Sequence, residues 1–212
     1  MKHVQLVIAV AAVAVVAGCA NPSRSRDLAN PKVAPVVTAQ QVCSSCHGMT
    51  GVSVSPNFPN LAAQTPMYLA VQLRDFRSHG RSDPAGFEYM WGLSRKLTDE
   101  QIEGLADYYA HQAPARATTK GDPARIAVGE RIFHEGVPGK NVPACMSCHG
   151  DRGQGNGQFP RLAGQHADYV VKQLVVFQRT NQRPTAAMMK IVAHELSGPE
   201  IENVAAYLQA LQ

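Results

Sequence analysis

The chain has 212 residues, of which 45% are hydrophobic, 6% aromatic and 17% charged, and its formal net charge is +4. So small a positive excess is no argument for nucleic-acid binding, and we expect no nucleic-acid partner. The cysteines number five, and four of them fall in two copies of one motif, which leaves no even set for a disulfide framework.

The N-terminus has the pattern of a bacterial export signal. The stretch from Val4 to Ala17 is apolar with one polar break, and it is too short for a comfortable membrane span. It leads into Val-Ala-Gly-Cys, which resembles the lipobox of bacterial lipoproteins and implies that Cys19 becomes a lipidated first residue. We therefore expect a signal peptide at residues 1–18, followed by a lipidated Cys19 and flexible tether at residues 19–35. The alternative is an ordinary signal peptide that is removed together with Cys19.

Two copies of Cys-x-x-Cys-His carry the chemistry of this sequence. In each copy the side chains lie at positions i, i+3 and i+4, so on a helical turn all three face the same way. Two thiols can then form thioethers with the vinyl groups of one haem while the imidazole binds its iron, which is the attachment site of a c-type haem. The sequence predicts two covalently bound c-type haems, attached through Cys43, Cys46, Cys145 and Cys148, with His47 and His149 as iron ligands.

Two other interpretations of Cys-x-x-Cys are open. A zinc site at a Cys, Cys and His corner needs a fourth ligand, which the eight histidines could supply. A thioredoxin-like redox pair lies in a strand-rich βαβ context, and no run of this sequence shows the alternation of a strand. The duplicated motif, the export signal and the methionine positions favour haem.

The chain contains an internal repeat. The segment from Phe58 to Gln64 matches the segment from Phe159 to Gln165, and the offset of 101 residues continues through the helix that follows. After the next loop the offset is 99 residues. Register over about seventy positions indicates gene duplication. We expect one cytochrome domain at residues 36–113, a polar linker at residues 114–121 and a second cytochrome domain at residues 122–212.

Every predicted element is a helix. A capping side chain followed by Pro, or by Gln or Glu three residues on, marks a helix N-terminus. Such starts lie at Thr38 with Gln41, Thr65-Pro66, Thr98 with Gln101, Asp122-Pro123 and Ser197 with Glu200, and one more helix follows His166. Each half is so short that it buries only a modest core, and we expect it to fold only around its haem.

An electron-transfer haem needs a second axial ligand, and methionine is the usual one in high-potential c-type centres. The repeat favours Met90 and Met189, which each lie seven residues before a leucine, Leu97 or Leu196. The other methionines either lack a methionine partner in the repeat or lie beside the haem motif. Core filling is the alternative role for a methionine near a helix end. We expect Met90 and Met189 to be the second iron ligands.

The pattern resembles the dihaem cytochrome c4 family. The shared marks are the tandem Cys-x-x-Cys-His motifs, Phe-Pro-x-Leu-Ala-x-Gln after each, and the methionine seven residues before Leu-Ser/Thr. The resemblance covers roughly Val36 to Gln212 and implies an all-α fold of two tandem class I cytochrome c domains related by pseudo-twofold symmetry. The chain departs from many family members at Ala63, where glycine is usual.

The resemblance also implies how the haem surroundings are built. In class I cytochromes a proline carbonyl accepts the Nδ1 proton of the haem histidine, and Pro59 and Pro160 stand at the matching places. The alternative is that both prolines only form turns. Candidates for hydrogen bonds to the haem propionates are Tyr68, Tyr169, Arg77 and Arg179.

The expected function is single-electron transfer between periplasmic or membrane redox partners, which the resemblance places between a quinol-oxidising complex and a terminal oxidase. With methionine filling the last iron position in both halves, no catalytic residue is expected and the chain is not predicted to be an enzyme. The alternatives are a dedicated cytochrome subunit of a periplasmic dehydrogenase and a dihaem peroxidase-like enzyme. The expected location is the periplasmic side of a bacterial membrane, anchored through lipidated Cys19, or otherwise the soluble periplasm.

Overall fold

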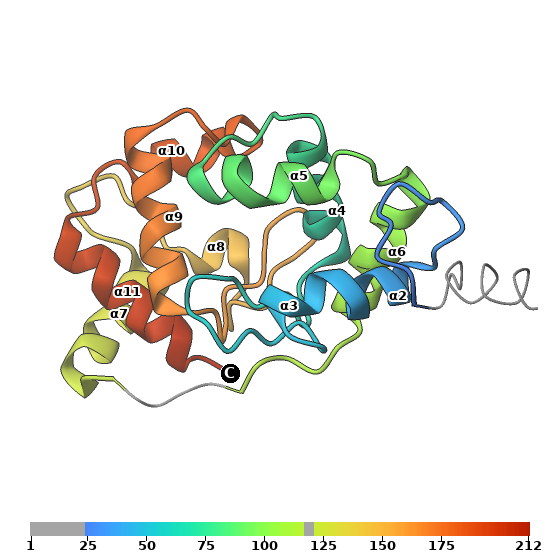
Figure 1. The fold of residues 1–212 in the computed structure, drawn as a ribbon. Coiled ribbons are helices and arrows are strands. Elements are labelled where there is room, and N and C mark those ends of the chain that lie inside the picture. The colour runs from blue at the N-terminus through green and yellow to red at the C-terminus, as the bar shows by residue number, and fades with distance from the viewer. Residues whose placement is uncertain (1–23, 117–120) are drawn as a thin grey trace, which may run out of the picture.

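The computed structural model describes residues 24–116 and 121–212. The predicted signal peptide and Cys19 lie outside the described residues. Within the described part the chain is helical, and its extended pairings are two isolated bridges, Val137 with Val142 and Asn156 with Phe159. No helix described there is both long and apolar enough to span a bilayer. The all-α prediction is confirmed, and Figure 1 shows the helices of the two halves side by side.

The first half begins with short helical segments around its Cys-x-x-Cys-His motif. Its elements are α2 (Pro35–Thr38), the π-helical segment η2 (Ala39–Cys43), α3 (Ser44–His47), α4 (Pro66–Arg77), the π-helical segment η3 (Gly86–Met90), α5 (Trp91–Ser94) and α6 (Asp99–Ala110). The first three form one continuous helical stretch that begins at Pro35, whose fixed φ suits the first helical position. The predicted capping box at Thr38 is therefore wrong: Thr38 is buried inside the stretch and its side chain caps nothing.

The second half repeats this plan without π-helical segments in its described residues. Its elements are α7 (Pro123–Glu135), α8 (Met146–His149), α9 (Ala167–Arg179), the 3₁₀ segment η4 (Pro184–Ala186), α10 (Ala187–Ala193) and α11 (Gly198–Ala210). Asp122 caps α7 as predicted, because its Oδ1 accepts from the Ala124 N–H at 2.9 Å. The helix ends at Gly136, where φ is +74° and a Cβ would lie 2.2 Å from the Val142 carbonyl oxygen.

The last helix of each half starts at its predicted capping box. At the start of α6, Thr98 Oγ1 accepts from the Gln101 N–H at 3.2 Å, and Gln101 Oε1 accepts from the Thr98 N–H at 3.0 Å. At the start of α11, Glu200 accepts from the Ser197 N–H at 2.7 Å. These bonds satisfy backbone donors that the first helical turn leaves free. Both predictions are confirmed.

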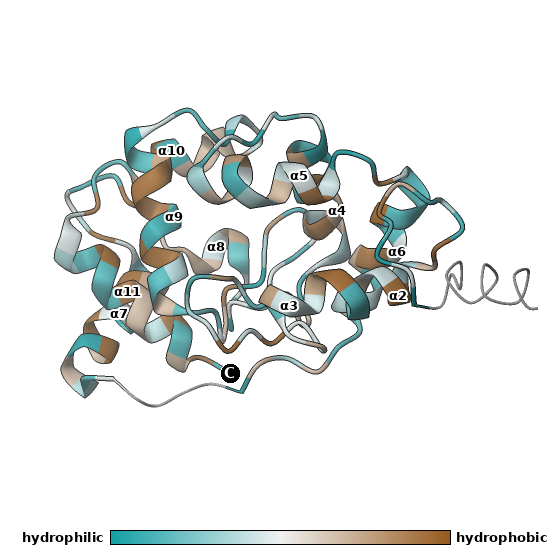
Figure 2. Ribbon diagram, viewed as in Figure 1, coloured by the Kyte–Doolittle hydropathy of each residue, from teal (hydrophilic) through white to brown (hydrophobic). Residues whose placement is uncertain are grey.

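Each half has its own hydrophobic core. In the first, residues of α4 pack against Ile102, Leu105 and Tyr109 on one face of α6. In the second, α7, α9 and α11 enclose the largest fully buried side chain, Phe133, together with Ile201. Bands of hydropathy along α9 and α11 in Figure 2 show the same one-sided pattern.

The segment before α2 packs against the first half. Val33 is 1% exposed, and Leu28 contacts the core. Gln101 Nε2 donates to the carbonyl oxygens of Asn30 and Val33, at 3.1 and 3.4 Å. The part of the expected tether that runs from Leu28 onward is thus bound to the first half and does not extend freely from it.

A reciprocal pair of glutamines joins the two halves. The Gln165 side chain accepts from the Asn60 N–H at 2.8 Å and donates to the Asn60 carbonyl at 3.0 Å. The Gln64 side chain binds the Arg161 backbone in the same way, at 2.6 and 3.0 Å. Because both pairs match in the repeat, a pseudo-twofold axis relates the four bonds. This glutamine clamp fixes the residue that follows each proline expected to hold a haem histidine.

Candidate haem-binding sites

Each Cys-x-x-Cys-His motif forms one helical turn, α3 in the first half and α8 in the second, with the first cysteine of the motif at the N-cap. The motif residues are Cys43, Cys46, His47, Cys145, Cys148 and His149. Glycine ends both turns in a conformation with positive φ. At Gly48 a Cβ would lie 2.1 Å from the Val52 carbonyl oxygen, so the chain can turn away from the motif only with glycine there.

The predicted proline carbonyls hold both haem histidines. His47 Nδ1 lies 2.9 Å from the Pro59 carbonyl oxygen, and His149 Nδ1 lies 2.9 Å from that of Pro160. Since a carbonyl only accepts, each Nδ1 carries the proton and each Nε2 keeps a lone pair. Burial lowers the pKa of both imidazoles and outweighs the opposing effect of these bonds, so the rings are neutral at pH 7. A neutral ring with a free Nε2 is the form that binds iron.

Among the described residues, no disulfide involves the four motif cysteines. Burial raises the pKa of Cys43 and of Cys145 to about 11. The described residues also contain no group of three or more His, Cys, Asp or Glu side chains placed to hold such an ion. Zinc therefore lacks a ligand set here, whereas the two sulfurs and one ring nitrogen that a c-type haem requires are present on each turn.

One buried polar atom of the first half also fits a haem thioether. The Tyr109 hydroxyl is buried beside the Cys43 thiol and forms no well-aligned hydrogen bond within the described residues. Burial and this neighbour raise the pKa of Tyr109, so it stays a donor. A thioether at Cys43 would have no proton of its own and would offer the hydroxyl an acceptor. The repeat has Leu208 at the matching position in the second half.

The predicted methionine ligands lie in different backbone settings. Met90 is the last residue of η3, and Met189 lies within α10. Two edge-on ring contacts connect the Met90 segment to the first haem histidine: Phe58 lies 6.1 Å from His47, and Tyr89 lies 6.4 Å from Phe58, between ring centroids. Single π-helical turns are frequent at functional sites, and η3 is one. The roles of Met90 and Met189 as iron ligands stay predictions.

Arg77, a predicted propionate partner, makes other contacts. Its Nη1 donates to the Leu97 carbonyl at 2.9 Å, and its Nη2 pairs with Asp99 at 2.7 Å. Arg77 therefore helps to fasten the end of α4 to the start of α6.

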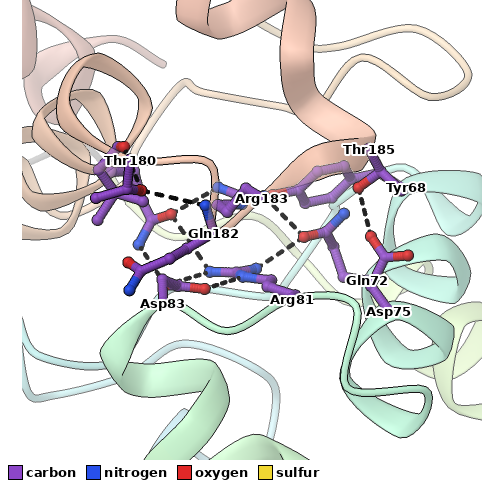
Figure 3. A network of polar contacts seen from close by, with 11 residues as sticks. Tyr68, Gln72, Asp75, Arg81, Asp83, Thr180, Gln182, Arg183 and Thr185 are labelled. Atoms are coloured by element: carbon purple, nitrogen blue, oxygen red, sulfur yellow. Dashed lines mark hydrogen bonds and ion pairs between the residues drawn. The ribbon is translucent and has the colours of Figure 1, made fainter.

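Sequence reasoning missed a buried polar network between the halves, drawn in Figure 3. Two arginines, Arg81 and Arg183, follow α4 and α9, and each donates to the side-chain oxygens of Gln72 and Gln173, at 2.6 to 3.3 Å. With Asp83 these residues form what we call the arginine network. The one signal in the sequence was the match between Gln72 and Gln173 in the repeat, since both are polar residues on partly apolar helices. The arginines themselves are 102 residues apart, in the loop where the repeat offset changes from 101 to 99, so the alignment does not pair them.

The chain is similar to known cytochromes in sequence and in fold. The family model for cytochrome c matches residues 36–112 and 126–212. Cytochrome c4 of Stutzerimonas stutzeri is 39% identical over 180 residues, which cover 80% of this chain and 84% of that protein. The solved cytochrome c4 of Acidithiobacillus ferrooxidans has a TM-score of 0.74 and 39% identity, and the match covers 80% of this chain and 98% of that one. The thiosulfate dehydrogenase electron acceptor of Stutzerimonas stutzeri A1501 is 35% identical over 173 residues, covering 80% of this chain and 78% of that protein.

Proposed function

The chain belongs to the cytochrome c family, and from this premise we propose that it carries single electrons between periplasmic or membrane-bound redox proteins. It is a dihaem electron carrier that binds two c-type haems covalently. The direction we propose is from a quinol-oxidising complex toward a terminal oxidase, with no substrate chemistry in the chain itself.

Each half is proposed to hold one haem by four side chains. The thioether sulfurs are those of Cys43 and Cys46 in the first half and of Cys145 and Cys148 in the second. The iron ligands are His47 and Met90 in the first half and His149 and Met189 in the second. Haem iron held in this way supplies reversible one-electron chemistry. The polypeptide attaches it, orients its ligands and keeps water from it.

The observation that carries this proposal is the duplicated bond from a haem histidine to a proline carbonyl, 2.9 Å in both halves. The bond fixes the tautomer and the orientation of the ring from behind, so the imidazole can stay in place whichever charge the iron has. Because both halves are built alike at this point, the structure favours the same task for both haems over a division into one catalytic and one carrier site.

Haem content and ligation can be tested in a host that matures c-type cytochromes. The mature chain should carry two haem increments in its mass, and the oxidised protein should show the near-infrared sulfur-to-iron band. Met90→Ala and Met189→Ala should each remove about half of that intensity, since each haem contributes one such bond. Met188→Ala is the matched control, because Met188 neighbours Met189 and is 64% exposed. Full intensity in Met189→Ala would show that this methionine is not a ligand.

The proposed location is the periplasmic side of a bacterial membrane, where Cys19 provides the lipid anchor. Radiolabelled palmitate should enter the wild-type protein, while Cys19→Ser should lose both the label and the membrane association. Capture of the native protein from membranes, followed by a redox titration of the complex, should recover an oxidase or a quinol-oxidising complex. Recovery in the soluble periplasm without label would contradict the anchor alone and leave the electron-transfer proposal standing.

A dedicated subunit of a dehydrogenase is the second candidate, and one relative favours it. The protein called thiosulfate dehydrogenase electron acceptor shares 35% identity with this chain. A dehydrogenase that co-purifies in constant ratio would support this candidate. A dihaem peroxidase-like enzyme would instead bind peroxide or cyanide rapidly at one reduced haem, which a methionine-ligated iron should not do.

A further inference from the structure

Two arginines that share the same glutamine partners lie buried where the halves meet. Arg81 and Arg183 are 4% and 6% exposed, and both guanidinium groups lie in the network of Figure 3. Each stacks on a phenylalanine of its own half, Arg81 at 4.5 Å from the Phe76 centroid and Arg183 at 4.7 Å from that of Phe177. Their glutamine partners bridge the two positive charges with neutral oxygens and supply no negative charge. The counter-charges must therefore come from groups other than the glutamines.

Only one of these arginines is hydrogen-bonded to a carboxylate among the described residues. Asp83, which is 1% exposed, accepts from Arg81 Nε at 2.6 Å and from Arg81 Nη2 at 3.2 Å. The residue two positions after Arg183 is Thr185, and its hydroxyl donates to Asp75 of the other half. Arg183 Nε has no hydrogen-bond partner among the described residues. The network thus holds two guanidinium charges and one carboxylate.

Arg183 carries a buried positive charge and has no carboxylate of the described residues in hydrogen-bonding contact, so we expect an anion beside it. A buried guanidinium without a counter-charge is strongly unfavourable, and the free Arg183 Nε can donate a charge-assisted hydrogen bond to one carboxylate oxygen. The other acceptor at this guanidinium outside the glutamines is the Tyr68 hydroxyl oxygen, 3.2 Å from Nη2. Each c-type haem of this protein brings two propionate carboxylates, which lie at the edge of the porphyrin away from its thioethers.

We propose that Arg183 binds a haem propionate carboxylate through its free Nε. The proposal rests on the proposed function, since it needs both haems in place. Either haem can supply the carboxylate, because the network lies between the halves. The two arginines therefore differ: Asp83 neutralises Arg81, whereas Arg183 takes its counter-charge from a haem.

The test compares three variants of the haem-loaded protein by redox titration at fixed pH and salt. Arg183→Gln removes a positive charge beside one haem, which favours its oxidised state, and the equilibrium constant for oxidation of that haem should rise about tenfold. Asp83→Asn removes a negative charge from the same network and should shift the equilibrium in the opposite direction. Arg183→Lys keeps the charge and should stay closest to wild type. Haem proton signals in the NMR spectrum of Arg183→Gln identify which of the two haems moves.

A direct readout is the propionate bending vibration in the resonance Raman spectrum, which should shift in Arg183→Gln and in Arg183→Lys because both lose the Nε–H donor. Unchanged vibrations and unchanged potentials in Arg183→Gln would overturn the proposal. If that variant does not fold, Arg183→Lys and Asp83→Asn decide: no vibrational shift in the first and no rise of potential in the second would overturn it. A wild-type potential that follows the concentration of added chloride or phosphate would show a free anion instead. Two haem increments in the wild-type mass keep the proposed function standing in each of these cases.

Discussion

The two halves of this cytochrome keep the same contacts at the haem motif but differ in the contacts that support it. In both, a histidine donates to a proline carbonyl at 2.9 Å, and a glutamine of each half binds the backbone of the other. In contrast, the first half uses π-helical segments before Cys43 and at Met90, and the described second half uses none. After the duplication, both halves kept the histidine–proline bond and the glutamine bonds next to it, whereas the packing of the surrounding helices diverged.

The helix crossings show this divergence most clearly. In each half the N-terminal helix packs on the C-terminal helix, α2 on α6 and α7 on α11. In the first half the glycine that allows close approach is Gly104 of the C-terminal helix, which faces Pro35. In the second half it is Gly129 of the N-terminal helix, which faces Asn203, and Asn203 occupies the repeat position of Gly104. Both halves thus keep a close helix contact, but the glycine lies on the C-terminal helix in the first half and on the N-terminal helix in the second.

The largest expected loss of stability comes from adding a side-chain carbon to the glycines at these two helix contacts. A Cβ at residue 129 would lie 2.0 Å from the Asn203 carbonyl oxygen, and two helix backbones would have to separate. We expect Gly129→Ala to lower the free energy of unfolding by about 3 kcal/mol or more. Gly104→Ala meets only the Pro35 ring, 2.4 Å away at Cγ, and gains helix propensity, so its net cost should be about 1 kcal/mol. Denaturant unfolding of the haem-loaded variants gives both values, and equal losses would contradict this account of the crossings.

Much of this architecture follows from local sequence chemistry. The positions of Thr98 and Ser197 predicted where α6 and α11 begin, because a capping box is decided within four residues. The same pattern at Thr38 failed, since Pro35 had already begun the helix three residues earlier. The pattern alone could not tell a helix start from a helix interior.

The interface could not be predicted in this way. Gln64 and Gln165 were visible only as matched polar residues, and nothing local shows that each binds backbone about a hundred residues away. The arginine network was hidden further by the change of repeat offset between Arg81 and Arg183. Contacts between halves depend on how two folded units meet, which no short motif encodes.

The second largest effect should come from the glutamine clamp. Gln165→Ala removes both bonds to the Asn60 backbone and the bond from the His166 N–H, and it leaves the buried Asn60 N–H and carbonyl without partners from Gln165. We therefore expect a loss of about 2 kcal/mol in stability. Gln64→Ala leaves the less buried Arg161 backbone, which water can reach more easily, and should cost about 1 kcal/mol. Thermal unfolding of both variants and of the double variant measures this. Two separate transitions in the double variant would show that the clamp makes the halves unfold together, and unchanged midpoints would show that it contributes nothing.

A smaller effect distinguishes the loops that carry the clamp. Ala63 has a φ of +55° and its repeat partner Gly164 a φ of +72°, in the region that favours glycine. Ala63→Gly should therefore stabilise the first half by about 1 kcal/mol by relieving backbone strain, despite the greater freedom of glycine in the unfolded chain. Gly164→Ala should do the reverse and bring its Cβ 3.0 Å from the Ala115 carbonyl oxygen. A rise of the unfolding midpoint in the second variant would contradict the assignment of strain.

The smallest change in stability at neutral pH is expected at the capping box of α11, and it should depend on pH in the second half only. Burial acts to raise the pKa of Glu200, but bonds from Lys140 and Ser197 outweigh it and lower this pKa to about 2, from the ordinary 4.5. A carboxyl whose pKa falls on folding adds stability above about pH 4.5, and that stability is lost as the pH falls toward 2. The first half has the uncharged Gln101 at this position.

We therefore expect Glu200→Gln to cost less than about 1 kcal/mol at pH 7, because Lys140 is partly exposed and its charge is screened. Between pH 4.5 and pH 2 the variant should lose less stability than wild type, since this carboxyl no longer takes up a proton on unfolding. Unfolding midpoints measured across this range test the slope. Gln101→Ala is the matched control: it should lower the midpoint at every pH and leave the slope as in wild type. If wild type and Glu200→Gln lose stability in parallel on acidification, the acid sensitivity of the second half arises elsewhere than at its capping box.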